Sequence, residues 1–309
     1  MAQLDRTRRK GIWLAAVTAL ISGFAVFFNG YGVRAWSDIA DPTAYTTVKN
    51  LVAALVIGGA AALLLAHRSA DRPQIPSSGR DRFALLAIAI IGGSVPFVLF
   101  FEGLALAGSA QAAAIHKTLL IWVALLALLF LRERIGWPHV AAIGLLVWGQ
   151  ITLLGGAGGL DFGRGEAMIL IATLLWSVEV VIAKRVMSHI STSTVALSRM
   201  GGGSLVLLAW ASIRGGGVDW TGLTSSHLVW ILVAGVFLSG YVLTWFAALS
   251  RAPAVDVTAV LVGGALVTAI LQSAVQGAAL PSPLGVALIA VGVAVVFLVG
   301  RPGKDVTSS

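Results

Sequence analysis

The stretch ALAGSAQAAAIHKTLLIWVALLALLFLRE (105–133) aligns without a gap with ALSRAPAVDVTAVLVGGALVTAILQSAVQ (248–276) when the chain is compared with itself at a shift of 143 residues. Both stretches are apolar and long enough to cross a bilayer, since roughly 20 helical residues span its hydrocarbon core. The similarity is weak, but it continues at the same shift, where Gly149 aligns with Gly292. A repeat of this length predicts that two copies of one unit build the fold.

The composition identifies an integral membrane protein. Of the 309 residues, 58% are hydrophobic and 11% are charged, and the mean hydropathy is +0.94. The charged residues separate ten apolar segments, near 12–33, 43–66, 83–106, 109–131, 138–157, 167–183, 193–213, 227–249, 254–276 and 283–300. The short alternating segments of an outer-membrane barrel are absent from the sequence. We therefore expect an all-α membrane protein with ten transmembrane helices.

An odd number of helices in each copy has a geometric consequence. After five crossings the second copy enters the membrane from the opposite side, so we expect two inverted five-helix repeats, residues 1–157 and 158–309. Two such units can rock against each other and open a site near the midplane to either side in turn, which is the geometry of a secondary transporter. The alternative is a duplicated scaffold without transport activity.

The basic residues predict that both termini are cytoplasmic. Fifteen of the 21 Lys and Arg residues lie in the two tails and in the loops on their side, three lie in the opposite loops, and three lie within spans. The basic start RTRRK precedes an apolar run that is too long for a signal peptide, so we count it as the first span. Since these charges lie in loops, the net charge of +8 does not indicate a nucleic-acid partner.

No cofactor or metal site is expected from the sequence. The chain has no cysteine, which excludes disulfides and thiolate metal sites. It also lacks a GxxxxGK[ST] nucleotide-binding loop, so we expect transport to be driven by a gradient. The motifs HExxH and GxSxG and a paired His–carboxylate spacing are absent as well, which argues against a membrane-embedded enzyme.

One segment carries a resemblance to a known family. FLRERIGWPHVAAIGLLVWG (130–149) resembles the end of the fourth helix, the Glu-Arg junction and the glycine-bearing fifth helix of EamA-type members of the drug/metabolite transporter superfamily. A degraded second copy runs to GVALIAVG (285–292), with Gln276 in the position of Glu133, and the proline often found near the position of Leu120 is missing. The resemblance implies ten helices, a central cavity lined mainly by helices one, three, four, six, eight and nine, and transport of small metabolites, often outward.

Charges within the apolar segments mark the candidate site. His116 and Lys117 lie about eight residues beyond the turn around Gly108, and Glu102 lies at a similar depth before it. An unpaired charge at this depth costs at least about 2.5 kcal/mol. We therefore expect Glu102 to pair with Lys117, either to pin the hairpin or as part of a substrate cavity. His116 either carries a coupled proton or bonds a backbone carbonyl.

A second cluster lies in the sixth segment, where Trp176 and Glu179 are three residues apart and share a helix face. Glu179 either binds a proton or a substrate amine, with Trp176 stacking on the substrate, or it pairs with a basic residue, Lys184 or Arg199. Two further aromatic side chains at i, i+4 spacing are predicted to line the same cavity: Tyr241 and Trp245.

Helix-weakening residues occur at matching positions of the two repeats. Pro96 aligns at the 143-residue shift with Ser239, next to Gly240. We expect hinges or unwound segments at Pro96 and Gly240, with simple packing kinks as the alternative.

Four other charges are expected to be structural. Lys49 and Arg199, which occupy related positions of the two repeats, lie near span starts from which long side chains reach the headgroups. Glu133 and Asp256 are expected to be charges at the cytoplasmic ends of helices, the latter next to Arg251.

These patterns predict a secondary transporter that exports a small polar metabolite, such as an amino acid or a related compound, across the cell inner membrane. The expected partners are the substrate, the lipid bilayer and, as a candidate coupling ion, the proton; the oligomeric state does not follow from the sequence. The principal alternative is a non-transporting membrane partner or a lipid-handling subunit.

Overall fold

The computed structural model describes residues 2–107, 112, 115–153, 162–214 and 217–299, and the regular elements within these residues are helices. In chain order they are α1 (Ala2–Trp36), α2 (Pro42–Ala66), α3 (Gly79–Ile91), α4 (Val95–Ala107), α6 (Leu119–Leu126), η1 (Ala127–Leu131), α7 (Trp137–Leu153), α8 (Arg164–Val186), α9 (Thr192–Leu197), η2 (Ser198–Gly202), α10 (Gly203–Arg214), η3 (Trp220–Gly222), α11 (Ser225–Leu249), α12 (Ala254–Leu261), α13 (Gly264–Gln276) and α14 (Pro283–Val299). The predicted all-helical fold is confirmed. The turn around Gly108 and the repeat boundary at 157/158 lie outside the described residues.

Seven helical stretches are long and apolar enough to cross a membrane: Arg6–Trp36, Pro42–Ala66, Gly79–Ala107, Arg164–Val186, Thr192–Arg214, Ser225–Leu249 and Ala254–Gln276. The other three predicted segments contain shorter apolar helices: Ile115–Leu131, Trp137–Leu153 and Pro283–Val299. The protein is thus a multi-pass membrane protein, with seven spans identified by length and composition.

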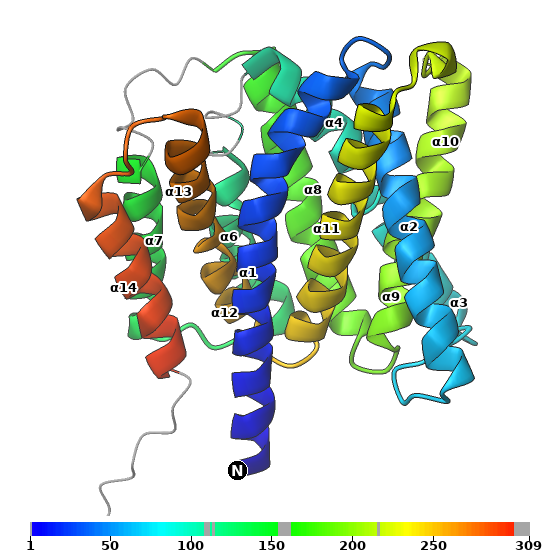
Figure 1. The fold of residues 1–309 in the computed structure, drawn as a ribbon. Coiled ribbons are helices and arrows are strands. Elements are labelled where there is room, and N and C mark those ends of the chain that lie inside the picture. Colours follow the sequence, from blue (N-terminus) through cyan, green and yellow to red (C-terminus); the bar gives the residue numbers. More distant parts are fainter. Residues whose placement is uncertain (1, 108–111, 113–114, 154–161, 215–216, 300–309) are drawn as a thin grey trace, which may run out of the picture.

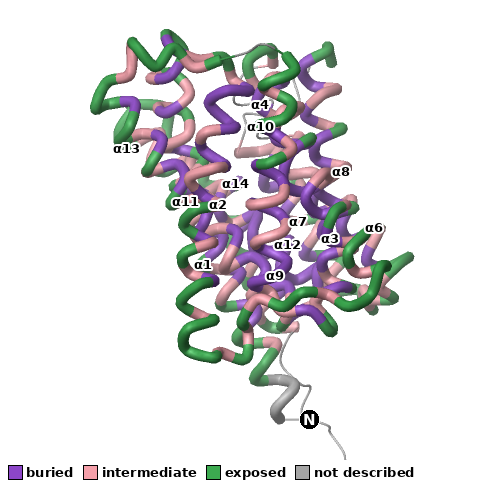
Figure 2. Tube along the Cα trace, turned by 90° about the vertical axis from the view of Figure 1, so that its right-hand side faces the viewer, coloured by how far each residue is buried: buried purple, intermediate pink, exposed green. Residues whose placement is uncertain are grey.

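The helices form one bundle whose long elements run roughly parallel or antiparallel to α1 (Figure 1). α1 packs along α11, α4 along α8, and α7 along α14. Buried residues concentrate in the middle of the bundle, and exposed residues lie on its outer edges and ends (Figure 2). Large apolar side chains such as Leu55, Leu63 and Leu205 are 62–69% exposed. Such a surface is unfavourable in water and matches a hydrocarbon environment.

The first and last described helices meet at one end of the bundle. Arg8 Nη1 in α1 donates a hydrogen bond to the carbonyl oxygen of Val299, the last residue of α14, at 3.3 Å. Figure 1 shows the start of α1 and the end of α14 at the same lower end of the molecule. We call this the N-terminal end of the bundle.

The third predicted span is interrupted between α3 and α4. α3 ends at Ile91 and α4 begins at Val95, so the three residues between them, 92–94, leave the helix, and Pro96 occupies the first turn of α4. Proline is well tolerated there because the first N–H groups of a helix have no partner within it. The interruption expected near Pro96 is therefore present, and its movement as a hinge stays a prediction.

The unwound segment considered at Gly240 is absent, because α11 is one continuous helix from Ser225 to Leu249; a hinge movement at Gly240 stays a prediction. Ser239, unlike Pro96, keeps its N–H group and has a small side chain that bonds its own helix, with Oγ donating to the carbonyl of Gly235 at 2.7 Å. A glycine alone costs a helix only about 1 kcal/mol, which is too little to break it where no water is present to satisfy the backbone.

The interruption also requires glycine at Gly93. A β-carbon there would overlap the carbonyl oxygen of Arg199, because the broken segment packs directly on the backbone of η2. We expect Gly93→Ala to lower the free energy of unfolding by about 1–3 kcal/mol through overpacking. The matched control is Gly58→Ala in α2, where a β-carbon would meet nothing within 4 Å. Thermal unfolding in detergent should show a clear loss of Tm for Gly93→Ala alone; equal Tm values would contradict this account of the packing.

Candidate functional site

A cavity of about 140 Å³ lies in the interior of the bundle and is lined from both halves of the sequence. The lining residues are Ser22, Ala25, Val26, Asn29, Lys49, Phe97, Phe100, Phe101, His116, Leu119, Trp176, Glu179, Val180, Arg199, Leu238, Tyr241 and Trp245. They come from α1, α2, α4, the start of the apolar helix Ile115–Leu131, α8, η2 and α11. We call this the central cavity.

Five of the seven predicted binding or coupling residues meet there: His116, Trp176, Glu179, Tyr241 and Trp245. The His116 ring lies edge-on to Trp176, with ring centroids 5.1 Å apart. Tyr241 and Trp245 stack on each other with centroids 5.9 Å apart and an interplanar angle of 10°. The i, i+3 and i, i+4 spacings thus place these side chains as expected, while their roles in binding or coupling stay predictions.

The predicted pair between Glu102 and Lys117 is wrong. Glu102 forms an ion pair with Arg214 at the end of α10 and accepts a hydrogen bond from the hydroxyl of Thr43 at 2.9 Å. Lys117 lines a different cavity. Consecutive residues of a helix point about 100° apart, and here the neighbouring His116 points into the central cavity.

Glu179 finds its partner in Arg199. The Nε atom of Arg199 lies 3.8 Å from Oε1 of Glu179, and the two side chains are 6% and 1% exposed. Arg199 belongs to η2, a π-helical stretch in the seventh span; such stretches are frequent at functional sites. Of the two partners considered for Glu179, the other one, Lys184, instead donates to the carbonyl oxygens of Leu249 and Ala252.

The interruption before Pro96 supplies backbone acceptors to this site. Because proline has no N–H group, the carbonyl oxygen of Gly92, four residues earlier, has no helical donor. That oxygen accepts hydrogen bonds from Trp176 Nε1 at 3.0 Å and from Arg199 Nε at 3.3 Å. The next carbonyl, that of Gly93, accepts from the Asn50 side chain at 3.3 Å. Side chains from α2, α8 and η2 therefore donate hydrogen bonds to the same unwound segment between α3 and α4.

Lys49 and Arg199 are also part of the central cavity, so the expectation that they extend to the headgroups is wrong. Lys49 is 2% exposed, and its Nζ lies 3.8 Å from the centroid of the Phe101 ring. A cation over an aromatic face is stabilised by the ring quadrupole, most strongly when water is excluded. Two features of the sequence could have indicated that both residues line the cavity: they occupy related positions in the two repeats, and they carry charge within an apolar segment.

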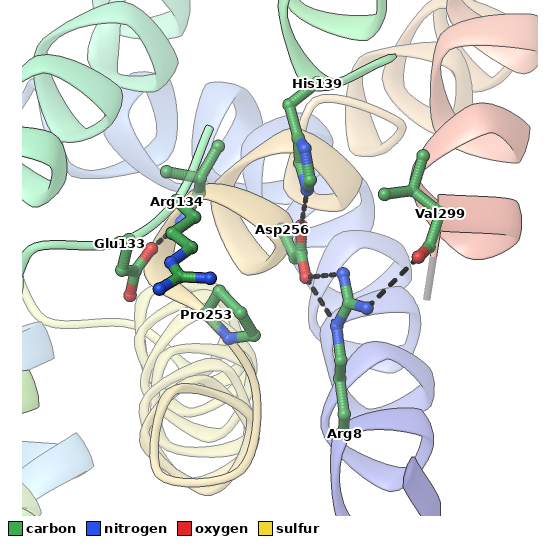
Figure 3. A pocket seen from close by; sticks show the side chains of 8 residues that line it. Arg8, Glu133, Arg134, His139, Pro253, Asp256 and Val299 are labelled. Atoms are coloured by element: carbon green, nitrogen blue, oxygen red, sulfur yellow. Dashed lines mark hydrogen bonds and ion pairs between the residues drawn. The ribbon is translucent and has the colours of Figure 1, made fainter. Parts of the chain in front are cut away.

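A second polar cluster lies at the N-terminal end of the bundle, where it lines a pocket (Figure 3). The buried carboxylate of Asp256, in the first turn of α12, accepts from Arg8 Nε at 3.0 Å and Nη2 at 2.6 Å, and lies 3.2 Å from His139 Nε2. Figure 3 shows Asp256 between these two side chains. Asp256 thus lies at a helix start, as expected, and its contacts with Arg8 and His139 join α1, α7 and α12.

Glu133 lies in the same region and has a structural role. Its carboxylate accepts hydrogen bonds from the backbone N–H groups of Ala254 at 2.7 Å and Val255 at 3.2 Å, the first two residues of α12. A carboxylate at this position satisfies unpaired donors and interacts favourably with the helix dipole. A cavity of about 380 Å³ opens beside these groups, but none of the seven predicted binding or coupling residues lines it, which leaves the central cavity as the stronger candidate.

The buried pair predicts a double-mutant result. Arg199→Met leaves Glu179 buried without its cation, which should destabilise the protein by about 3–5 kcal/mol. Adding Glu179→Gln should recover much of this loss, since removing both charges of a buried pair is often nearly neutral. Thermal unfolding of the two single mutants and the double mutant measures the coupling; strictly additive losses would mean that the two side chains do not stabilise each other.

Comparison with known proteins agrees with this architecture. Residues 9–155 and 163–299 each match the model of the EamA-like transporter family. A search of curated proteins finds no match. A solved crystal structure of a protein is similar in fold, with a TM-score of 0.73, 19% sequence identity and coverage of 93% of this chain and 97% of the other. Because the two family matches together span most of the sequence, the chain belongs to the EamA-like transporter family of the drug/metabolite transporter superfamily.

Proposed function

We propose that the protein is a secondary active transporter that exports a small polar metabolite, such as an amino acid or a related compound, across the cell inner membrane. The observation that carries the proposal is the central cavity, an interior space whose charged and aromatic lining comes from both halves of the chain. A structural scaffold has no need of Lys49, Glu179 and Arg199 in its interior, because buried charges are costly and usually functional within a membrane. Membership of a transporter family favours transport over catalysis.

Symmetric packing supports two inverted five-helix repeats, residues 1–157 and 158–309, with ten transmembrane helices. α1 and α8 are the first helices of the two repeats, and α11 corresponds to the α3–α4 pair at the 143-residue shift. Accordingly, both α1 with α11 and α8 with α4 form extensive contacts. α7 and α14, the fifth helix of each repeat, pack against each other. The end of α8, at Lys184, bonds residues beside the start of α12 near Arg8, so α8 runs opposite to α1. Repeats with this relation can alternate access around a central site.

The lining charges favour a substrate with an anionic group. Lys49 and Arg199 supply two cations, and Glu179 is the one carboxylate among the described residues of the lining. A substrate carboxylate would balance the excess cation, and a substrate amine could interact with Glu179 or with the faces of Trp176 and Tyr241. This arrangement fits a compact zwitterion or small acid, in agreement with the amino-acid class proposed here.

The proposed orientation places both termini in the cytoplasm. It is supported by the meeting of Arg8 and Val299 at one end of the bundle and by the excess of basic residues in the loops there. Ser78, the N-cap of α3, is exposed at this end, and Ser225 is exposed at the opposite end, where α11 begins.

We predict that an impermeant thiol reagent labels Ser225→Cys in intact cells and labels Ser78→Cys only after permeabilisation. The chain has no native cysteine that would interfere. Labelling of Ser78→Cys but not Ser225→Cys in intact cells would reverse the proposed orientation.

The transport proposal is tested in proteoliposomes loaded with a mixture of isotope-labelled amino acids and small organic acids, with efflux measured by mass spectrometry. We expect rapid efflux of one or a few compounds, and loss of that efflux in Trp176→Ala, which removes a wall of the cavity. Trp148→Ala is the matched control, because Trp148 lies on the outer surface of α7 and is 61% exposed. No efflux above that of empty liposomes for any compound would favour the non-transporting alternative.

The same liposomes test proton coupling, which we propose for Glu179 or His116 because both can change charge and both line the cavity. An imposed pH gradient should accelerate wild-type flux. Glu179→Gln or His116→Ala should lose this acceleration and retain exchange at equal pH. Glu102→Gln, a carboxylate variant outside the cavity, should keep it. Unchanged gradient dependence in both cavity variants would exclude these residues as the proton carriers.

A further inference from the structure

A third cavity, of about 230 Å³, lies beside the central one and shares none of its described lining residues. It is lined by Ile115, Lys117, Thr118, Leu120, Ile121, Leu146, Val147, Gln150, Ile151 and Val262, from the fourth span, α7 and the end of α12. All but three of these side chains are apolar. We call this the lateral cavity.

Lys117 is its one charged lining residue among those described, and it has no counter-charge. Within the described part of the chain it forms no ion pair and no hydrogen bond. Lys117 is partly buried, and its surroundings differ from those of the buried Lys49, whose Nζ lies over three aromatic rings. A cation in a membrane span without such compensation is unfavourable, so an anion in this cavity would be stabilised.

Gln150 supplies a second unused donor. The residue is 9% exposed, and its Nε2 atom has no hydrogen-bond partner among the described residues. A buried amide donor without a partner is costly and uncommon. Thr118 does not meet this need, because its hydroxyl donates to the carbonyl of Ile115 at 2.6 Å and accepts from Trp122 Nε1 at 3.1 Å.

We propose that the lateral cavity binds the anionic head of an amphiphile, a carboxylate or a phosphate attached to an apolar body. The head accepts hydrogen bonds from Lys117 Nζ and Gln150 Nε2, and the apolar body lies against side chains such as Leu120, Ile121 and Leu146. Charge-assisted bonds of this kind are the strongest available to an anion in an apolar environment. Such a ligand comes either from the surrounding bilayer, as an anionic lipid, or from solution, as an organic acid with a short apolar chain.

The test uses purified full-length protein in a neutral detergent and compares two probes with their uncharged or zwitterionic analogues. Phosphatidylglycerol is compared with phosphatidylcholine by native mass spectrometry, and octanoate is compared with octanol by thermal shift. A ligand that binds only the folded protein raises its apparent stability. We expect at least one anion to bind in preference to its analogue, and the probe that responds identifies the source.

Matched variants assign the binding to this cavity. Lys117→Met and Gln150→Leu should each weaken binding of the responding anion on the order of tenfold, since each removes a bond to a charged group. Lys117→Arg should retain binding because it keeps the charge, and Lys49→Met should retain it because Lys49 lines the central cavity. Lys117→Met removes an uncompensated charge, so it should fold at least as well as the wild type.

The proposal is overturned if neither anion binds better than its analogue, or if binding persists in the Lys117→Met, Gln150→Leu double mutant. Loss of binding in Lys49→Met but not in Lys117→Met would also overturn it, since the anion would then occupy the central cavity.

Discussion

The central cavity depends on one missing backbone donor. Pro96 has no N–H group, so the carbonyl of Gly92 is left without a helical partner and is available to Trp176 and Arg199. A free carbonyl within a membrane must be satisfied by protein groups, and here the groups that satisfy it are the ones that line the cavity. The ion pair with Glu179 follows, because Arg199 is held in place by the same oxygen. A local break in one helix thus organises the contacts among three helical stretches, α3–α4, α8 and the one that contains η2.

Two lysines within apolar segments, the buried Lys49 and the partly buried Lys117, show how different the surroundings of such a charge can be. Lys49 lies over aromatic rings, and Lys117 lies among aliphatic side chains with an unpaired amide nearby. An aromatic surface compensates a cation partly, and aliphatic groups do not. The surroundings of Lys49 therefore offset part of the cost of its charge, whereas those of Lys117 leave a cation that an anion would stabilise, as proposed for the lateral cavity.

Much of the fold could be predicted from the sequence, because helix length and apolar composition are local properties. The same holds for Trp176 and Glu179, whose spacing places them on one helix face. The partner of Glu102 could not be predicted in this way, because the end of α10, which carries Arg214, is brought to it by tertiary packing. The repeat alignment also did not predict that the helix is interrupted before Pro96 but continues through Ser239 and Gly240. Pro96 and the aligned Ser239 differ in one backbone N–H group, and that group decides whether the helix continues.

Ion pairs of different exposure lie at the two ends of the bundle. At the N-terminal end, Asp256 is fully buried between Arg8 and His139. At the other end, the Arg214 and Glu102 side chains are 53% and 25% exposed. An exposed ion pair contributes about 0–1 kcal/mol, whereas breaking a buried one costs about 3–5 kcal/mol. The Asp256 cluster is therefore expected to be the stronger of the two contacts, because its carboxylate is removed from solvent and shared between two helices besides its own.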